Sequence, residues 1–420
     1  MAQFGVHNEG MLEYPLKRQE DGTIIPDVSV SEIHEYNQQL IENQIEIGIR
    51  ADELGYEFVV HPENHLKLLA KSSPTPLQVQ VAIAQETEDI RLLQMANVLP
   101  WHEPVKLAER IGMLDTISDG RAEVGVSTGT GNRERGVFEQ YRRSSPPDGD
   151  ENWDIFIEKL EILVQAWTKD YFEYHSEHHD LPPESTRQDI ELEYEYLADE
   201  KSGVSPRELV HLDSEPRTLR SISVFPRPKQ QPHPQLWKPV GSKRSAIWAA
   251  QHGLNACTYC VDFSWVEELI QTYHRVAEKT GWPDHRPKYD GRPFNYGWDE
   301  QRGRGVTAEV LVFNTEVATE ETFERYKRGV EFLFAIDNVK VGTQETEEAA
   351  ADAERHINQH DAPIVGDTDE IIDQLARFRD VCGYEDFIVF PTIGVPGLEH
   401  EEKLTQMETF AEQVVPYFED

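Results

Sequence analysis

One stretch, residues 91–131, constrains the fold of this chain more than any other. An apolar segment is followed by Pro104, which suits the first turn of a helix because its missing N–H has no partner there. Four apolar residues then recur on one helical face, Leu107, Ile111, Leu114 and Ile117. Asp119-Gly120 ends the helix, since glycine readily adopts the left-handed conformation of a C-terminal cap. A second apolar strand follows and opens into a loop rich in glycine and threonine. The stretch therefore predicts a β-α-β unit that ends at a ligand-binding loop.

Strand-like and helix-like segments alternate along the rest of the chain. Eight strand-then-helix units can be counted, from residues 4–6 to residues 399–417. Such alternation is typical of a parallel sheet, and eight units without a midpoint break favour a closed (β/α)8 TIM barrel over an open doubly wound sheet. We therefore predict a single α/β barrel domain over residues 1–420. Two polar, irregular stretches, about 177–220 and 283–305, are predicted to be insertions at the C-terminal face of the strands, where they would cover the site.

The composition is strongly acidic, with 78 Asp and Glu against 40 Lys and Arg and a net charge of -38. The carboxylates are spread along the chain, which indicates a densely hydrated, salt-adapted surface rather than a calcium-binding one. No basic face is present for nucleic acid, and no apolar stretch resembles a signal peptide or a membrane span. We expect the cytoplasmic protein of a halophile, with neither nucleic acid nor membrane as a partner.

Two groups of residues that could ligate a metal ion are not predicted to bind one. Cys257 and Cys260 form a C-x-x-C, but a strand directs residues three apart to opposite faces, so we expect both to pack in the core. No second C-x-x-C completes a zinc site. The histidine-rich group lies in a charged stretch, where a solvated loop is the better interpretation: His175, His178, His179 and Asp180.

Candidate site residues follow from the rule that barrel active sites lie at the C-terminal ends of the strands. Small and hydroxyl residues there, beside a helix that begins near Ser245, suit a phosphate bound by backbone N–H groups, although serine before a helix is also a common cap. The candidates are Glu63, Asn64, His65, Met95, Ala96, Thr128, Gly129, Thr130, Gly131, Gly241, Ser242, Ser245 and Tyr259.

Five blocks of sequence carry a family resemblance: ADELGYEFVVHPENHL (51–66), VLPWHEPVKLAERIGMLDTISDGRAEVGV (98–126), PVGSKRSAIWAAQHGL (239–254), VGDTDEIIDQL (365–375) and METFAEQVVPYF (407–418). Together they resemble the bacterial luciferase-like flavin-dependent monooxygenases, and the second block is the most specific. The resemblance implies a (β/α)8 barrel that uses reduced FMN, or in relatives the deazaflavin F420. Its monooxygenases form a flavin C4a-(hydro)peroxide with O2 and oxygenate a small organic substrate. A separate flavin reductase and a homodimer, packed through helices near the second and third units, are also implied.

The resemblance assigns roles to several residues. Met95-Ala96 match a bulge, often with a non-prolyl cis peptide, against the flavin ring. Ser242 and Ser245 match phosphate contacts, and the loop Thr128, Gly129, Thr130 and Gly131 lies near the phosphate. Gly241 and Tyr259 complete the predicted cofactor site. His65, beside Glu63, is the candidate acid or base.

Three positions depart from the family pattern. Thr128 replaces an arginine near the phosphate, so we expect weaker flavin binding or compensation by Lys243 or Arg244. Asn64 replaces a histidine implicated in catalysis, and asparagine exchanges no protons near neutral pH; Gly241 replaces a glutamate. An FMN-dependent monooxygenase is the leading hypothesis. An F420-dependent oxidoreductase that transfers hydride, and a flavin-binding protein without turnover, remain open.

The acidic surface predicts a salt-dependent stability. At 1 M salt the Debye length falls to about 3 Å, so repulsion among carboxylates is largely screened. We expect the midpoint of thermal unfolding to rise from dilute buffer to molar KCl, measured by circular dichroism. Equal midpoints at low and high KCl would contradict a salt-adapted surface.

Overall fold

The computed structural model describes residues 3–67, 70–129, 132–138, 151–183, 219–260, 262–280, 306–341, 361–382 and 388–419. Eight parallel strands form a closed ring, because β1 pairs with both β4 and β13 while β10 pairs with both β9 and β11. The ring strands are β1 (Gln3–His7), β4 (Phe58–His61), β5 (Arg91–Val98), β6 (Ala122–Ser127), β9 (Leu236–Pro239), β10 (Asn255–Tyr259), β11 (Val306–Asn314) and β13 (Ile388–Thr392). The predicted (β/α)8 TIM barrel is confirmed.

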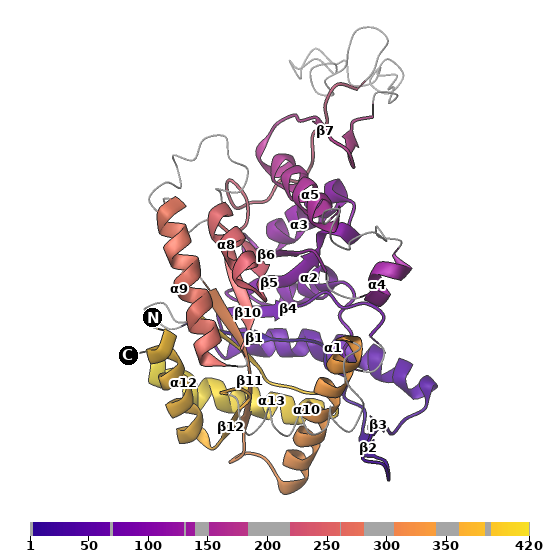
Figure 1. Cartoon of the computed structure of the whole chain (residues 1–420). Helices are drawn as coiled ribbons and strands as arrows, with labels where there is room; N and C mark the ends of the chain where they lie inside the picture. Colours follow the sequence, from indigo (N-terminus) through magenta and orange to yellow (C-terminus); the bar gives the residue numbers. More distant parts are fainter. Residues whose placement is uncertain are drawn as a thin grey trace.

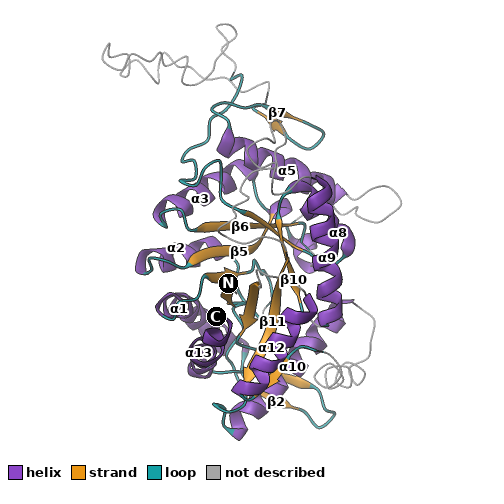
Figure 2. Cartoon of the chain, turned by 90° about the vertical axis from the view of Figure 1, so that its left-hand side faces the viewer, coloured by secondary structure: helices purple, strands orange, loops and turns teal. Residues whose placement is uncertain are grey.

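Helices surround the ring of strands on the outside (Figures 1 and 2). They are α1 (Val30–Glu53), α2 (Pro76–Glu86), α3 (Pro104–Ile117), α5 (Glu151–Thr168), α8 (Lys243–His252), α9 (Phe263–Thr280), α10 (Glu320–Val341), α12 (Thr368–Cys382) and α13 (His400–Thr409). Shorter elements are η1 (Leu99–Trp101), α4 (Asn132–Val137), η4 (Phe410–Val414) and η5 (Val415–Phe418). Among the described residues, no helix is long and apolar enough to cross a membrane.

Five short strands lie outside the ring. β2 (Leu16–Arg18) and β3 (Ile24–Pro26) form one hairpin, and β7 (Tyr174–His175) and β8 (Asp180–Leu181) form another. β12 (Ile364–Gly366) pairs in parallel with the C-terminal end of β11. The second hairpin includes the start of the predicted 177–220 insertion, of which residues 184–218 lie outside the described part. The 283–305 insertion lies outside it completely, so both insertions stay predictions.

The histidines of the β7–β8 hairpin contact carboxylates. His175 Nδ1 lies 2.6 Å from Asp180 Oδ1, and His179 Nδ1 lies 2.7 Å from Glu158 Oε2. His175 and Asp180 are both about half exposed, so solvent screens this pair. The two histidines are thus explained as partners of carboxylates on a surface hairpin.

Strand periodicity divides the core into an inner and an outer layer. Phe58 and Val60 of β4 point into the barrel, whereas Val59 between them packs against the helices. Cys257 belongs to the inner cluster and Cys260, just after the end of β10, to the outer one. The two cysteines therefore lie on opposite faces of the strand, as their spacing predicts.

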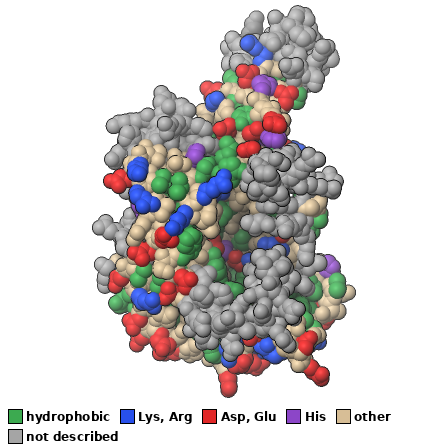
Figure 3. Space-filling view, viewed as in Figure 1, with side chains coloured by type: hydrophobic (Ala, Val, Ile, Leu, Met, Phe, Trp, Pro, Cys, Tyr) green, Lys and Arg blue, Asp and Glu red, His purple; other side chains and the backbone are tan. Residues whose placement is uncertain are grey.

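The surface view agrees with the dispersed charge of the sequence. On the face shown in Figure 3, the acidic side chains are scattered over several elements, with lysines and arginines between them. A dispersed arrangement leaves each carboxylate hydrated, which is the condition for the salt response predicted above. Salt adaptation itself stays a prediction.

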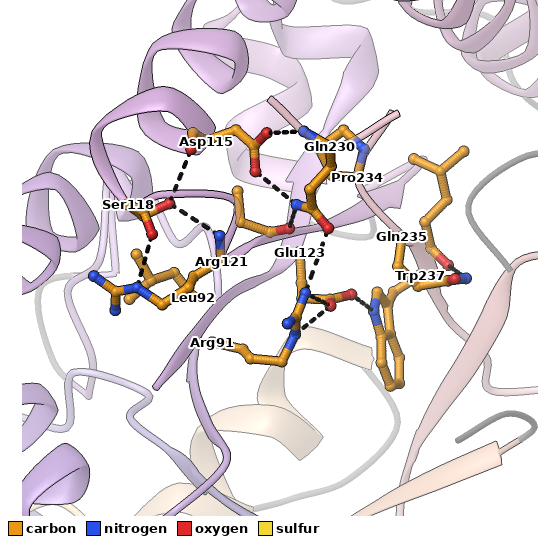
Figure 4. Close-up of polar contacts among 12 residues, drawn as sticks. Arg91, Leu92, Asp115, Ser118, Arg121, Glu123, Gln230, Pro234, Gln235 and Trp237 are labelled. Carbon is orange, nitrogen blue, oxygen red and sulfur yellow. Dashed lines mark hydrogen bonds and ion pairs between the residues drawn. The ribbon is translucent and has the colours of Figure 1, made fainter. Parts of the chain in front are cut away.

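A buried carboxylate joins three strands at the N-terminal end of the barrel (Figure 4). Glu123 of β6 is 0% exposed. The Arg91 guanidinium of β5 donates to Glu123 Oε1 at 2.6 Å, and the Trp237 indole N–H of β9 donates to Oε2 at 2.7 Å. Because charge-assisted bonds satisfy both oxygens, the buried charge is compensated and fixes the register of β5, β6 and β9.

We expect Arg91→Met to destabilise the fold by about 3–5 kcal/mol, because it leaves the Glu123 carboxylate buried without its cation. Urea unfolding at constant KCl measures the loss. The matched control is Lys17→Met, which removes the exposed Lys17–Asp27 pair and should change stability little. Equal losses in the two variants would show that the buried pair has no special role.

Candidate functional site

A cavity of about 420 Å³ lies at the C-terminal ends of six barrel strands. Eight of the sequence-predicted site residues line it: Glu63, Asn64, Met95, Ala96, Thr128, Gly129, Gly241 and Tyr259. His65, Ser242 and Ser245 lie next to lining residues in the chain but are not among them. Thr130 and Gly131 lie outside the described residues. The barrel thus brings together most of the predicted set, from five strands and the loops that follow them.

The wall formed by β5 carries the predicted irregularity. The Met95–Ala96 peptide bond is cis, and the β5–β6 register shifts between Gln94 and Asn97. Gly125 faces this point, where an added Cβ would lie 2.1 Å from the Gln94 carbonyl oxygen, so only glycine allows the close approach. The Asn97 side-chain amide donates to the Gly125 carbonyl at 3.1 Å. The bulge and the cis peptide are confirmed, while their contact with a flavin stays a prediction.

A second glycine shapes the loop after β6. Gly129 has a φ of +73°, and a Cβ there would lie 2.7 Å from Val98 Cγ1. Both its backbone conformation and its close approach to β5 require the absence of a side chain. Gly129 consequently presents only backbone to the cavity that it lines with Thr128.

Ser242 caps the N-terminus of α8. Its hydroxyl accepts from the Ser245 backbone N–H at 3.2 Å, and the Ser245 hydroxyl contacts the Ser242 backbone in return, which forms a capping box. Ser242 is exposed and Ser245 is partly exposed. The structure therefore shows both serines as helix-capping residues. A phosphate at this position would bind to the N–H groups of the first turn of α8, beside Gly241.

The two basic residues expected to replace the missing arginine do not line the cavity. Lys243 is half exposed and forms an ion pair with Glu268 of α9. Arg244 is exposed. The cavity instead has Lys67 and Lys238 among its lining residues.

Glu63 lies between two histidines. His65 Nε2 is 2.7 Å from Glu63 Oε1, and His102 Nε2 is 2.9 Å from Oε2, which also accepts the Val98 backbone N–H at 2.7 Å. Burial raises the pKa of Glu63, but the hydrogen bonds from His102 and His65 outweigh it, so the pKa lies below its ordinary value. The carboxylate is thus an anion at neutral pH that orients both imidazoles.

Asn64 is held beside this group. Its side-chain oxygen accepts from Lys67 Nζ at 2.6 Å, and its backbone N–H donates to the Ser73 carbonyl. An asparagine amide can position a ligand by hydrogen bonding but transfers no proton near neutral pH. Asn64 is therefore neither an acid nor a base at this wall, in contrast to the ionisable Glu63 beside it.

His102 was missed by sequence reasoning. His102 follows η1 within residues 98–126, in a segment whose sequence pattern indicates only a connection between a strand and a helix. Only the position of η1 against the loop after β4 brings His102 to Glu63, 39 residues earlier in the chain. The one indication in the sequence was that His102 belongs to residues 98–126, the block with the most specific family resemblance.

The opposite wall holds a buried thiol and a carboxylate. Cys257 Sγ lies 3.3 Å from Glu309 Oε1, and His7 Nδ1 lies 3.5 Å from Glu309 Oε2. Burial raises the pKa of the Cys257 thiol, and the Glu309 charge raises it further. The thiol is therefore protonated at neutral pH and is a poor nucleophile.

One group of described residues has ligand atoms close enough to hold a metal ion. The ligand atoms of His7, Glu9 and Glu309 lie within 4.8 Å of one another. Lys71 Nζ already bonds Glu9 at 2.8 Å. Burial raises the pKa of Glu9, but Lys71 and His7 outweigh it and bring the pKa to about 2. Because a lysine already compensates Glu9, we assign no metal here.

The fold and the cavity define a (β/α)8 barrel with a large cavity at its strand ends, and comparison with known proteins shows which family it resembles. The sequence profile described as "Luciferase-like monooxygenase" matches residues 24–191. The resemblance to the luciferase-like monooxygenases seen in the sequence is confirmed over these residues.

Several curated relatives are named as monooxygenases. The chain is 24% identical over 397 residues to the oxygenase component of the flavin-dependent trigonelline monooxygenase of Acinetobacter baylyi, which covers 91% of each chain. It is 28% identical to 2,5-diketocamphane 1,2-monooxygenase 1 of Pseudomonas putida, over 32% of this chain and 35% of that one. The match to the uncharacterized protein y4wF of Sinorhizobium fredii, at 26% identity over 51% of this chain, likewise spans half of that protein's length.

Solved structures share the fold. Monooxygenase RslO1 of Streptomyces bottropensis has a TM-score of 0.67 at 19% identity over 99% of both chains. The oxygenating constituent of 3,6-diketocamphane monooxygenase of Pseudomonas putida, in complex with FMN, has a TM-score of 0.61 at 17% identity over 96% of this chain and 98% of that one. An F420-dependent secondary alcohol dehydrogenase reaches 0.62 at 13% identity over 100% and 99%.

The lowered pKa of Glu63 predicts an acid-dependent loss of stability. A carboxylate whose pKa is lower in the folded state stabilises the fold above its unfolded pKa, and this contribution is lost as pH falls through the folded pKa. We expect the wild type to exceed Glu63→Gln in thermal midpoint at pH 7 and this difference to shrink below about pH 4.3. The control Glu35→Gln, at an exposed position of α1, should show no such trend. A pH-independent difference would contradict the assigned ionisation.

Proposed function

We propose that this chain is the oxygenase component of a two-component, FMN-dependent monooxygenase. The observation that carries the proposal is the cis Met95–Ala96 bulge on the wall of a large strand-end cavity, in a luciferase-like barrel. The relative from Acinetobacter, named as an oxygenase component, supports the two-component arrangement because the alignment covers nearly the whole of both chains.

The residues present suit a flavin. Met95, Ala96 and Val98 give one wall an apolar surface against which a flat ring system can pack, and Trp101 adds an aromatic side chain. The glycine-containing ends of β6 and β9 leave room for the cofactor tail near the first turn of α8. When bound, reduced FMN supplies the electrons that activate O2.

The protein's part in the reaction is to position groups and control protons. Glu63 lines the cavity and holds His65 and His102 in fixed orientations next to it, so a proton can pass between the carboxylate and either imidazole. Asn64 orients a ligand by hydrogen bonding. The protonated Cys257 thiol and the apolar wall give an environment that limits side reactions with water.

We propose two macromolecular partners. A separate flavin reductase would deliver reduced FMN, as the oxygenase-component name of the relative implies for that protein. A second copy of the chain would pack on α3, where Met113 is 51% exposed and Ile117 is 36% exposed. Two apolar side chains on one exposed helical face are typical of a packing surface.

A deazaflavin-dependent hydride transfer is the second candidate. The similarity of the barrel to an F420-dependent alcohol dehydrogenase, together with the neutral Thr128 near the expected phosphate position, favours keeping it. Such an enzyme would reduce or oxidise its substrate without incorporating oxygen. A flavin-binding protein without turnover would do neither.

The test combines the protein with photoreduced FMN and then with isotopically labelled O2 in the presence of candidate substrates. Because relatives are named for trigonelline and diketocamphanes, the panel contains N-methylpyridinium carboxylates and bicyclic ketones. We expect a labelled oxygen atom in the product by mass spectrometry, and a loss of at least roughly tenfold in turnover for His102→Ala, as is typical for proton-transfer groups.

A parallel arm supplies reduced F420 without O2. Substrate reduction in that arm, with no oxygen incorporation in the first, would replace the monooxygenase by the hydride-transfer alternative. Tight flavin binding with substrate-independent reoxidation would identify a binding protein. A surface control, Lys106→Ala, should leave turnover unchanged.

A further inference from the structure

Lys238 of β9 is a buried cation beside the cavity. It is 3% exposed and is one of the residues that line the cavity. Its Nζ lies 4.5 Å from the ring centre of Phe156, 5.2 Å from that of Trp153 and 5.6 Å from that of Trp248. Lysine is rarely buried to this extent unless it is paired with an anion.

No carboxylate partner of Lys238 is found among the described residues. The aromatic rings of α5 and α8 attract the ammonium through their π faces, but they supply no counter-charge. Burial lowers the pKa of Lys238 to about 8, so the charged form is held at a cost. An arrangement of this kind favours an anion bound close to the ammonium.

The position of Lys238 in the chain identifies where that anion would lie. Pro239, Val240 and Gly241 follow it along the cavity wall and lead directly into the N-cap of α8 at Ser242. The first turn of a ten-residue helix presents free N–H groups and a partial positive charge there. The buried lysine and the residues that lead into the N-cap of α8 thus line the same cavity.

Other cations are engaged elsewhere. Lys67, the second lysine of the lining, bonds Asn64 near the loop after β4. Lys243 is exposed and paired with Glu268. In a chain with a net charge of -38, a bound dianion needs a local positive charge, and Lys238 is the lining cation nearest in sequence to the cap of α8.

We propose that Lys238 selects the phosphorylated cofactor by providing the positive charge for a phosphate monoester bound at the N-terminus of α8. This role rests on the flavin-binding function proposed above. It assigns to Lys238 the compensation for Thr128 that the sequence suggested for Lys243 or Arg244. It also explains why a lysine is kept among three aromatic rings without a carboxylate.

Equilibrium binding of FMN and of riboflavin, which lacks the phosphate, separates this role from packing. Flavin fluorescence is titrated with wild type, Lys238→Met, Lys238→Arg and the control Lys243→Met, in the same KCl buffer. We expect Lys238→Met to weaken FMN binding by roughly 10- to 100-fold, the range of a hydrogen bond to a charged group, and to leave riboflavin binding unchanged. Lys238→Arg should restore most of the FMN affinity, and Lys243→Met should keep the ratio of the two affinities.

The pH dependence gives a second readout on the wild type. The ammonium is charged below its pKa, so FMN affinity should fall as pH rises from 7 to 9, whereas riboflavin affinity and the Lys238→Arg variant should be insensitive. Competition by inorganic phosphate at millimolar concentration against FMN, but not against riboflavin, is expected if free phosphate occupies the same position.

Three outcomes overturn the assignment. Equal losses for FMN and riboflavin in Lys238→Met would show a packing role, and unchanged FMN affinity would show that the phosphate binds elsewhere. If Lys238→Met fails to fold, a flat pH profile of FMN binding by the wild type refutes the proposal. Absence of binding of either flavin to the wild type would instead refute the proposed function.

Discussion

The buried Glu123 carboxylate is the interaction on which the rest of the barrel depends. It lies at the N-terminal end of the ring, where Arg91 and Trp237 satisfy both of its oxygens and tie β5, β6 and β9 together. The other ends of these three strands carry the cis bulge, the glycine loop and the approach to α8. A charge that is expensive to bury without partners thereby fixes the register of the strands that form the cavity. The buried Glu123 group and the candidate cavity thus lie at opposite ends of the barrel, the arrangement that is common in this fold.

Close backbone approach determines the shape of the cavity. Gly125 allows β6 to contact the bulge of β5, and Gly129 reverses the chain against Val98. Side chains at these two positions would collide with backbone or with β5. The two glycines therefore allow the backbone to approach closely at the cavity wall, because neither has a Cβ atom. The capping box of α8 separately holds the N-terminus of that helix in place.

The electrostatics inside the cavity differ from those of the surface. Outside, the excess of carboxylates is dispersed and hydrated. Inside, Glu63 is compensated by two imidazoles and a backbone N–H, and Lys238 is surrounded by aromatic rings without a carboxylate. Low local polarity strengthens each of these interactions, so the few charged groups of the cavity act more strongly than the hydrated charges of the surface.

Local sequence determined the fold class, most helix limits and the opposite faces of Cys257 and Cys260, because helix and strand periods act over a few residues. Family resemblance added the bulge at Met95-Ala96, which no propensity rule predicts. Only the tertiary structure brings Glu63 into contact with His102. It also decides that Lys238, and not Lys243, lines the cavity. The reason is geometric: closure of the ring sets which strand ends face one another and which side chains are buried, and neither is encoded in sequence spacing.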